Sequence, residues 1–385
     1  MNHALPAVAE STAATARGVG PVGPAFEDVQ RIAVLRGGGL GDLMFAVPAI
    51  DALKARYPQA RITLLGTPLA AALLRDRPGP VSDVEILPVA PGIREGLADP
   101  LAVEEFFHRM AALNFDLAVQ IHGGGRNSNP FLLRLGARHT IGTRTPDAAA
   151  LERTIPYIYY QHEVFRALEV AGLAGAEPRI LEPRIAVRAG ELDDAARLVP
   201  GDGPLVTLHP GATDPRRRWP AESFAAVAAL AAADGARVLV VGDEGDIPAA
   251  QEILRRARRQ APDASITSLA GDLDLGQLAG VLAASTVVVG NDSGPRHLAQ
   301  AVGTPTVGVY WIGNVISAGA IGRALHRVHL AWVIACPTCG VDVTQVGWTA
   351  ERCEHDDSLV GSVQPDAVYS DVRELMATNL PLRGR

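Results

Sequence analysis

The sequence has few cysteines, few aromatic residues and no long apolar run. Three cysteines in 385 residues exclude the disulfide framework of a small secreted scaffold and favour a reducing compartment. No stretch reaches the roughly 18 apolar residues of a membrane span, so we expect at most peripheral contact with a membrane. The net charge of −7 argues against nucleic acid as a partner. We therefore expect a globular, cytoplasmic protein.

The beginning of the sequence lacks the basic start and the apolar core of a signal peptide. It is rich in Ala, Gly and Pro, so residues 1–28 are predicted to be a disordered tail. The remaining chain is long enough for two domains, and 48% of the residues are hydrophobic, which is ample for two cores.

Short apolar runs alternate with segments of helical periodicity in both halves of the chain. Strands are predicted at 31–35, 61–65, 117–121, 205–208, 238–241, 265–269, 287–289 and 306–310, and helices at 43–57, 161–171, 221–233, 273–284 and 295–302. Two prolines at 177–185 (EPRILEPRI) indicate a linker. The pattern predicts an α/β protein with two Rossmann-like, doubly wound domains, 29–180 and 181–365, facing a central cleft. A C-terminal helix within 366–385 is expected to pack back on the first domain.

The most informative segment is 287–311 (VVVGNDSGPRHLAQAVGTPTVGVYW). It predicts a buried strand, a polar turn that caps a short helix, and a second strand. Such a turn directs unpaired backbone N–H groups and the positive end of a helix at the crevice above the sheet, which favours an anion. His297 can add a proton-sensitive donor there. An ordinary strand-to-helix connection remains the alternative.

A glycine-rich loop, GGGLGD at 37–42, lacks two familiar signatures. Asp42 stands where a dinucleotide fingerprint needs its third glycine, and no Gly-Lys-Ser/Thr follows as in a P-loop. What remains is a flexible loop that ends in a carboxylate at the start of a helix. Asp42 could accept a proton from a hydroxyl nucleophile or simply cap the helix, and the sequence leaves both roles open.

Two further motifs follow predicted strands. In HPGATDPRRRWP (209–220), adjacent arginines could bind phosphate oxygens or form a solvated face. In VGDEGD (241–246), a carboxylate could hold ribose hydroxyls or cap a loop.

Together, RGGGLGD, HPGA…RRRWP and NDSGPRHLAQAVGTPTVGVYW resemble glycosyltransferase family 9, the heptosyltransferase-like enzymes of bacterial envelope assembly. The resemblance spans about 31–368 and implies a GT-B architecture, with the acceptor on the N-terminal domain and a nucleotide sugar, usually ADP-heptose, on the C-terminal domain. It implies that Asp42 is the general base. The implied donor-binding residues are Gly39, Gly41, Thr213, Arg217, Glu244, Asp292, Ser293, Gly294 and His297. The chain departs from the family in its GGG loop and in having Arg217 where the best-known members have lysine.

The resemblance implies that a sugar moves from an ADP-sugar to a hydroxyl of a glycolipid, polysaccharide or protein acceptor, at the inner face of the inner membrane if the acceptor is a lipid. We expect no catalytic metal, because the diphosphate motifs contain no Asp-x-Asp pair. An oligomer is compatible with the sequence. Two other functions remain open: a non-catalytic nucleotide-sugar-binding protein, and a sugar-nucleotide epimerase of GT-B architecture.

Acceptor contacts are the hardest to predict. The candidates lie at the end of a predicted strand and at the start of a predicted helix: His122, Asn127, His162 and Glu163. A lone histidine is more often structural than functional.

All three cysteines lie in one segment, as Cys336-x2-Cys339-x13-Cys353-x-His355. Three thiols and an imidazole form a four-ligand set for structural zinc or iron, although free buried thiols or a redox pair remain open. A branch of the family that glycosylates autotransporter proteins is identified with such a cysteine-bound iron. Because the cluster follows the donor motif, we expect a structural clamp that leaves the donor contacts unchanged.

Overall fold

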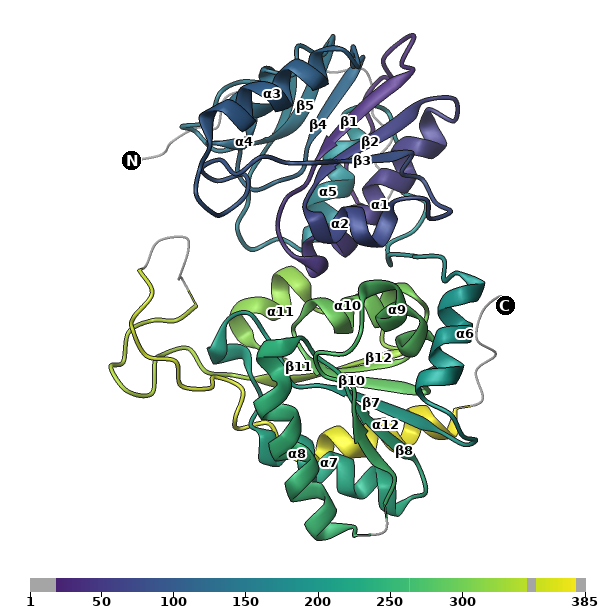
Figure 1. Ribbon diagram of the computed structural model, residues 1–385. Helices are drawn as coiled ribbons and strands as arrows, with labels where there is room; N and C mark the ends of the chain where they lie inside the picture. The colour runs from purple at the N-terminus through teal and green to yellow at the C-terminus, as the bar shows by residue number, and fades with distance from the viewer. Residues whose placement is uncertain (1–18, 263, 345–350, 379–385) are drawn as a thin grey trace.

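The computed structural model describes residues 19–262, 264–344 and 351–378, which form two α/β domains (Figure 1). The first sheet is parallel, in the order β3-β2-β1-β4-β5-β6. Its strands are β1 (Arg31–Leu35), β2 (Arg61–Gly66), β3 (Asp83–Ile86), β4 (Leu117–Gln120), β5 (His139–Arg144) and β6 (Arg153–Pro156). Its helices are α1 (Leu40–Arg56), α2 (Pro68–Leu74), α3 (Pro100–Ala111), α4 (Ser128–Leu133) and α5 (Glu163–Gly172).

The second sheet repeats this topology, in the order β9-β8-β7-β10-β11-β12. Its strands are β7 (Leu205–His209), β8 (Arg237–Val240), β9 (Ile266–Ser268), β10 (Val287–Asn291), β11 (Thr306–Trp311) and β12 (His326–Ala331). Its helices are α6 (Ala189–Leu198), η1 (Pro215–Arg217), α7 (Ala221–Ala233), η2 (Glu244–Asp246), α8 (Ile247–Gln260), α9 (Leu275–Ala284), α10 (Gly294–Ala301), α11 (Ile312–Ala318) and α12 (Pro365–Ala377). The predicted pair of doubly wound domains is confirmed.

Figure 1 shows α9, α10 and α11 on the side of the second sheet that faces the first domain, and α7, α8 and α12 on the other side. The central strands are buried on both faces, because helices cover both sides of each sheet. Val287, Val288 and Val289 of β10 are fully buried, as their β-branched run predicts. Each helix in the described ranges is too short or too polar to cross a membrane.

The predicted disordered tail is wrong for residues 19–28. The Gly23 N–H donates to the Gly172 carbonyl at the end of α5, at 2.9 Å. Phe26 is buried, and its ring stacks on the His139 ring with 4.1 Å between centroids. The apolar side chain thus joins the first core despite the Pro- and Gly-rich composition around it. Residues 1–18 lie outside the described part of the chain.

The C-terminal helix does not pack on the first domain as expected. α12 contacts α7, β10 and β11, and it buries Val368 and Val372 in the second core. Its acidic side chains also bind β12, because Asp371 accepts from His329 at 2.9 Å and Glu374 from Arg327 at 2.9 Å. The helix therefore completes the second domain on its outer face.

The domains are joined by a buried ion pair where the linker passes between them. Arg77, in the loop after α2, donates from Nη1 to Glu191 Oε2 of α6 at 2.9 Å and makes a second contact through Nη2. Both side chains are at most 8% exposed.

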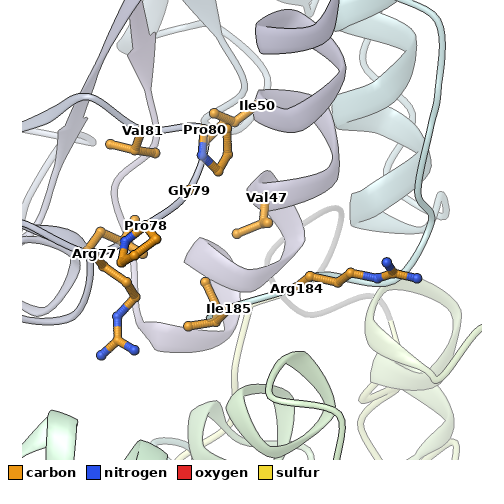
Figure 2. Close-up of a pocket in the computed structure, with 10 residues that line it drawn as sticks. Val47, Ile50, Arg77, Pro78, Gly79, Pro80, Val81, Arg184 and Ile185 are labelled. Carbon is orange, nitrogen blue, oxygen red and sulfur yellow. The ribbon is translucent and has the colours of Figure 1, made fainter. Parts of the chain in front are cut away.

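Beside this pair, a pocket of about 20 Å³ is lined by Val47, Ile50 and Ile185 (Figure 2). It has room for a single water molecule, so it is a packing defect and not a ligand site.

We expect Arg77→Met to lower the free energy of unfolding by about 3–5 kcal/mol, because it leaves the Glu191 carboxylate buried without its ion pair. Guanidinium denaturation measures the change. Arg77→Met/Glu191→Leu should recover much of the loss, because no charge then remains buried. The control Arg197→Met removes an exposed arginine of α6. A single Arg77→Met variant as stable as this control would show that the pair contributes nothing.

Candidate active site

The predicted motifs meet at the carboxyl ends of the central strands. The glycine loop follows β1, and His122 follows β4, its neighbour in the first sheet. The arginine-rich loop follows β7, and the NDSG turn follows β10, its neighbour in the second sheet. Strand order reverses at these two places, which is where open α/β sheets bind ligands. The fold therefore gathers the candidate residues from both halves at the seam between the domains.

Two helix N-termini meet across this seam. α1 begins after Gly39, and α10 begins after Ser293. A Cβ placed on Gly41 would lie 3.2 Å from His297 Cδ2, and one on Gly294 would lie 2.8 Å from Leu40 Cβ. Only glycine allows the backbones to approach so closely. Two positive helix ends therefore converge on one place, which favours a doubly charged anion such as a diphosphate.

Asp42 lies in the first turn of α1 beside this place. Its Oδ2 accepts from the Gly39 N–H at 2.9 Å, and its Oδ1 accepts from Arg36 Nη2 at 2.7 Å. The side chain remains 46% exposed. Asp42 therefore does cap the helix, and its exposed edge still leaves a carboxylate oxygen within reach of a bound hydroxyl.

Glu163 is linked to Asp42 through Arg36. The buried Arg36 guanidinium donates to Glu163 Oε2 at 3.1 Å and to the Ile121 carbonyl at 2.6 Å. Burial opposes ionisation of Glu163, but the charges of Arg36 and Arg166 outweigh it and lower the pKa of this carboxyl. Glu163 is therefore a fixed counter-ion that holds Arg36 beneath Asp42.

The other acceptor candidates have structural partners or are exposed. His122 accepts from the Gly37 N–H at its Nδ1 (3.2 Å) and contacts the Gly92 carbonyl through Nε2 (3.0 Å). Burial and the charge of Arg36 lower the pKa of His122, so it is neutral. His162 caps α5 and reaches the Gly319 carbonyl of the second domain at 2.8 Å. Asn127 is exposed at the start of α4.

Asp292 is the centre of the donor half. It is 4% exposed, and both of its carboxylate oxygens have partners. Oδ1 contacts His297 Nε2 at 2.9 Å, and Oδ2 accepts from Arg217 Nη1 at 3.3 Å and from Asn314 Nδ2 at 2.7 Å. Burial opposes the charge, but the hydrogen bond with His297 and the nearby arginines hold the pKa of Asp292 far below its usual value. Asp292 is thus a permanent anion that orients Arg217 and His297.

Three other donor candidates lie around this network. Arg217 ends η1 with a quarter of its side chain exposed, so part of the guanidinium can meet a ligand. Ser293 Oγ pairs with His209 Nδ1 at 3.0 Å. Thr213 is exposed in the same loop as Arg217.

Two carboxylates of the VGDEGD motif, Glu244 and Asp246, differ in exposure. Glu244 is exposed at the start of η2, whereas Asp246 turns inward and lies 3.4 Å from His209 Nε2. Sequence reasoning missed His209, Asp246 and Asn314 as members of the site. The first two stand within the quoted motifs, and nothing in the sequence marks Asn314.

The Cys and His residues converge as predicted. One ligand atom from each of Cys336, Cys339, Cys353 and His355 lies within 4.8 Å of all the others. The Cys336 carbonyl accepts from the Gly340 N–H at 2.9 Å, so the first two cysteines share a tight turn. His355 Nδ1 is buried and has no hydrogen-bond partner among the described residues, as expected of an atom that is free to bind a metal. The set fits a four-coordinate structural zinc or iron site.

Buried neutral histidines should make the fold sensitive to acid. Burial and the charge of Arg296 lower the pKa of His297 to about 4 and that of His326 to about 3. Unfolded histidines titrate near pH 6.5, so the unfolded chain binds more protons below that pH. The free energy of unfolding should therefore fall as the pH drops from about 6.5 towards 4.

His326→Gln should make this decline shallower, by up to about 1.4 kcal/mol per pH unit between pH 6 and 4, because one proton fewer is taken up on unfolding. Glutamine can keep the bond that His326 makes with Thr306 Oγ1. The measurement is denaturant unfolding at several pH values, with His108→Gln on the exposed side of α3 as control. Equal slopes in both variants would contradict the assignment.

A family model described as glycosyltransferase family 9 (heptosyltransferase) matches residues 103–332. Lipopolysaccharide heptosyltransferase 2 of Salmonella typhimurium is 28% identical over 295 residues, which cover 73% of this chain and 82% of that protein.

Solved structures agree in fold. The structure of E. coli ADP-heptose LPS heptosyltransferase II superposes with a TM-score of 0.68 at 22% identity, covering 90% of this chain and 98% of its own. The iron-containing dodecameric glycosyltransferase TibC of enterotoxigenic E. coli superposes with a TM-score of 0.52 at 14% identity, covering 91% and 77%. The predicted GT-B architecture is confirmed.

Proposed function

Because the chain belongs to glycosyltransferase family 9, the heptosyltransferase family, we propose that it transfers a heptose from ADP-heptose to a hydroxyl of a lipopolysaccharide core glycolipid. One observation carries the proposal. A half-exposed carboxylate, Asp42, lies beside two converging helix N-termini and a partly exposed arginine, Arg217. A glycosyl transfer needs this combination of a base next to an anion site.

The donor half would hold the leaving group. The diphosphate would lie against the backbone N–H groups at the start of α10 and against Arg217. As the bond from the anomeric carbon to the diphosphate oxygen breaks, the electron pair passes to ADP, whose added negative charge these groups stabilise. Asp292 would act by orienting Arg217 and His297, because both of its oxygens are already engaged. Glu244 is the exposed carboxylate available to the ribose, whereas Asp246 is engaged by His209 and the Asp243 N–H.

The acceptor half would supply the nucleophile. The acceptor hydroxyl oxygen forms the new bond to the anomeric carbon and gives its proton to Asp42. Arg36 fixes the Asp42 carboxylate, and Glu163 fixes Arg36. Asn127 lies exposed near the same edge and could contact the acceptor sugar, whereas the ring nitrogens of His122 and His162 already have backbone partners. With a lipid acceptor, the reaction would take place at the inner face of the inner membrane.

Cys336, Cys339, Cys353 and His355 would hold zinc or iron. All four positions come from the protein, so the metal would supply a cross-link and leave no open position for a substrate. Every step of the transfer is assigned to side chains and backbone groups at the seam.

Asp42→Asn should lower the transfer rate about 10²- to 10⁴-fold, the usual contribution of a positioned general base. Mass spectrometry of the product from ADP-heptose and heptose-deficient core glycolipid measures the rate. Asparagine can keep the cap on the Gly39 N–H, so donor affinity should change little. Asp51→Asn on the same helix is the control. Near-normal turnover of Asp42→Asn would show that Asp42 only caps the helix.

Replacing the glycolipid with candidate polysaccharide or protein acceptors in this assay separates the possible acceptors. Donor turnover without any acceptor would instead point to a hydrolase or an epimerase.

Arg217→Ala should weaken binding of ADP by about 1.5–3 kcal/mol, the range for hydrogen bonds to charged groups. Titration calorimetry gives the affinity. Arg218→Ala is the matched control, because Arg218 is the exposed neighbour and its Nε is bound to the Ala212 carbonyl. Unchanged affinity of Arg217→Ala would remove this residue from the donor site.

A further inference from the structure

The metal-ligand cluster belongs to a segment that returns to the arginine-rich loop. We call the described residues 332–344 and 351–358 the cysteine arm; in Figure 1 it extends from the end of β12 as the loops at the left of the second domain. Its two ends lie beside β11 and η1, within the second domain.

The returning end of the arm is bonded to η1 on both sides of Arg217. The Leu359 N–H, just past the arm, donates to the Arg216 carbonyl at 2.8 Å, and Ser358 Oγ donates to the Arg218 carbonyl at 2.7 Å. Arg352, adjacent to Cys353, lies 3.8 Å from Asp214 Oδ1. The backbone on either side of Arg217 is therefore hydrogen-bonded to the returning end of the arm.

Arg216 joins the same loop to the outgoing end of the arm. It is 4% exposed and donates from Nη2 to Asp214 Oδ2 at 2.6 Å. Its guanidinium lies 5.7 Å from the ring centroid of Trp311, whose Nε1 donates to the Val333 carbonyl in the arm at 2.8 Å. The outgoing end of the arm thus contacts Trp311, which packs against Arg216, and the returning end bonds the η1 backbone directly.

The Nη1 atom of Arg216 is consistent with a negative charge on the metal-bound cluster. Nη1 is buried and has no hydrogen-bond partner in the described part of the chain. Three thiolates and a neutral imidazole around a divalent ion would leave one net negative charge, and the buried Arg216 guanidinium would supply the opposite charge within the same domain.

We propose that the metal-bound cysteine arm fixes η1 and so positions Arg217, which makes metal loading a determinant of affinity for the ADP diphosphate. The proposal rests on the donor role proposed for Arg217. It replaces the expectation of a clamp that leaves the donor contacts unchanged.

The physical reason is preorganisation. η1 is only three residues long, and the Arg217 side chain is held by Asp292, whose Oδ2 and main-chain carbonyl both accept from Nη1 at 3.3 Å. Without the arm, the loop would have to be ordered when the diphosphate binds, and the cost in entropy would appear as lost affinity.

A hollow of about 350 Å³ beside the loop is lined by Arg218 and Trp219 and by Asp356 and Ser358 next to the last metal ligand. The arm therefore also forms part of the surface around the donor loop.

Calorimetry with ADP tests the proposal on purified full-length protein, before and after removal of the metal by a chelator. Elemental analysis should first find about one zinc or iron per chain. Metal removal should weaken ADP binding on the order of tenfold while circular dichroism shows the fold retained. Unchanged affinity would overturn the proposal.

A double-mutant cycle tests whether Arg217 carries the effect. In Arg217→Ala, removal of the metal should weaken ADP binding by much less than in the wild type, because the positioned group is already missing. Equal weakening in both proteins would show that the arm acts elsewhere and would overturn the proposal. If the metal-loaded wild type does not bind ADP at all, the proposed donor site, and not the role of the arm, is wrong.

A second variant covers the case in which metal removal unfolds the protein. Arg352→Gln/Ser358→Ala removes the two side-chain links between the arm and the donor loop, leaves the backbone bond from Leu359 to Arg216, and keeps all four ligands. It should retain the metal and yet bind ADP several-fold more weakly, with Arg255→Gln/Arg256→Gln on the exposed face of α8 as control. A variant with full metal and full ADP affinity would contradict the coupling.

Discussion

The architecture depends on the close approach of two helix N-termini across the seam between the domains. Gly41 and Gly294 allow α1 and α10 to begin within van der Waals contact of one another. A Cβ at Gly294 would come within 2.8 Å of Leu40 Cβ and force the two helices to shift, and one at Gly41 would press on the His297 ring. Because both helices follow central strands, the seam brings the carboxyl edges of the two sheets to a single place.

Each half of the site is organised around a buried charge with several partners. In the first domain, Arg36 joins Asp42 to Glu163; in the second, Asp292 joins Arg217 to His297 and Asn314. The residue at the centre of each network is of opposite charge to the group that faces the cleft. Asp42 and Arg217, which are both partly exposed, are therefore each held by a buried partner and can present their charge to the cleft without losing their position.

The sequence was informative where the physics is local. The valine run of β10 follows from burial on both faces of the sheet, and the glycine loop at the start of α1 and the polar turn at the start of α10 are local signals, so these motifs could be placed correctly. Four strands were missed: β3, β5, β6 and β12. β3, β6 and β12 are edge strands with polar or exposed residues, and β5 (HTIGTR) lies inside the sheet but has only one large apolar residue. The role of Asp292 could not be predicted, because its partners come from η1 and α11, far away in the sequence. The ends of the chain were misjudged for the same reason: Phe26 and Val368 are buried against surfaces that the sequence does not reveal.

The Arg77–Glu191 pair lies beside the linker, where Arg77 also donates to the Ala186 carbonyl. Away from the linker, the packing of α1 on α10 continues the contact, and hydrogen bonds from His162 to the Gly319 carbonyl and from Tyr160 to the Thr344 carbonyl also cross the seam. The buried ion pair thus lies at the linker end of the seam. Because α1 and α10 are in contact across the seam, any rotation that separated the domains would also separate Asp42 from Arg217, so the two halves of the site are complete only when the domains are closed.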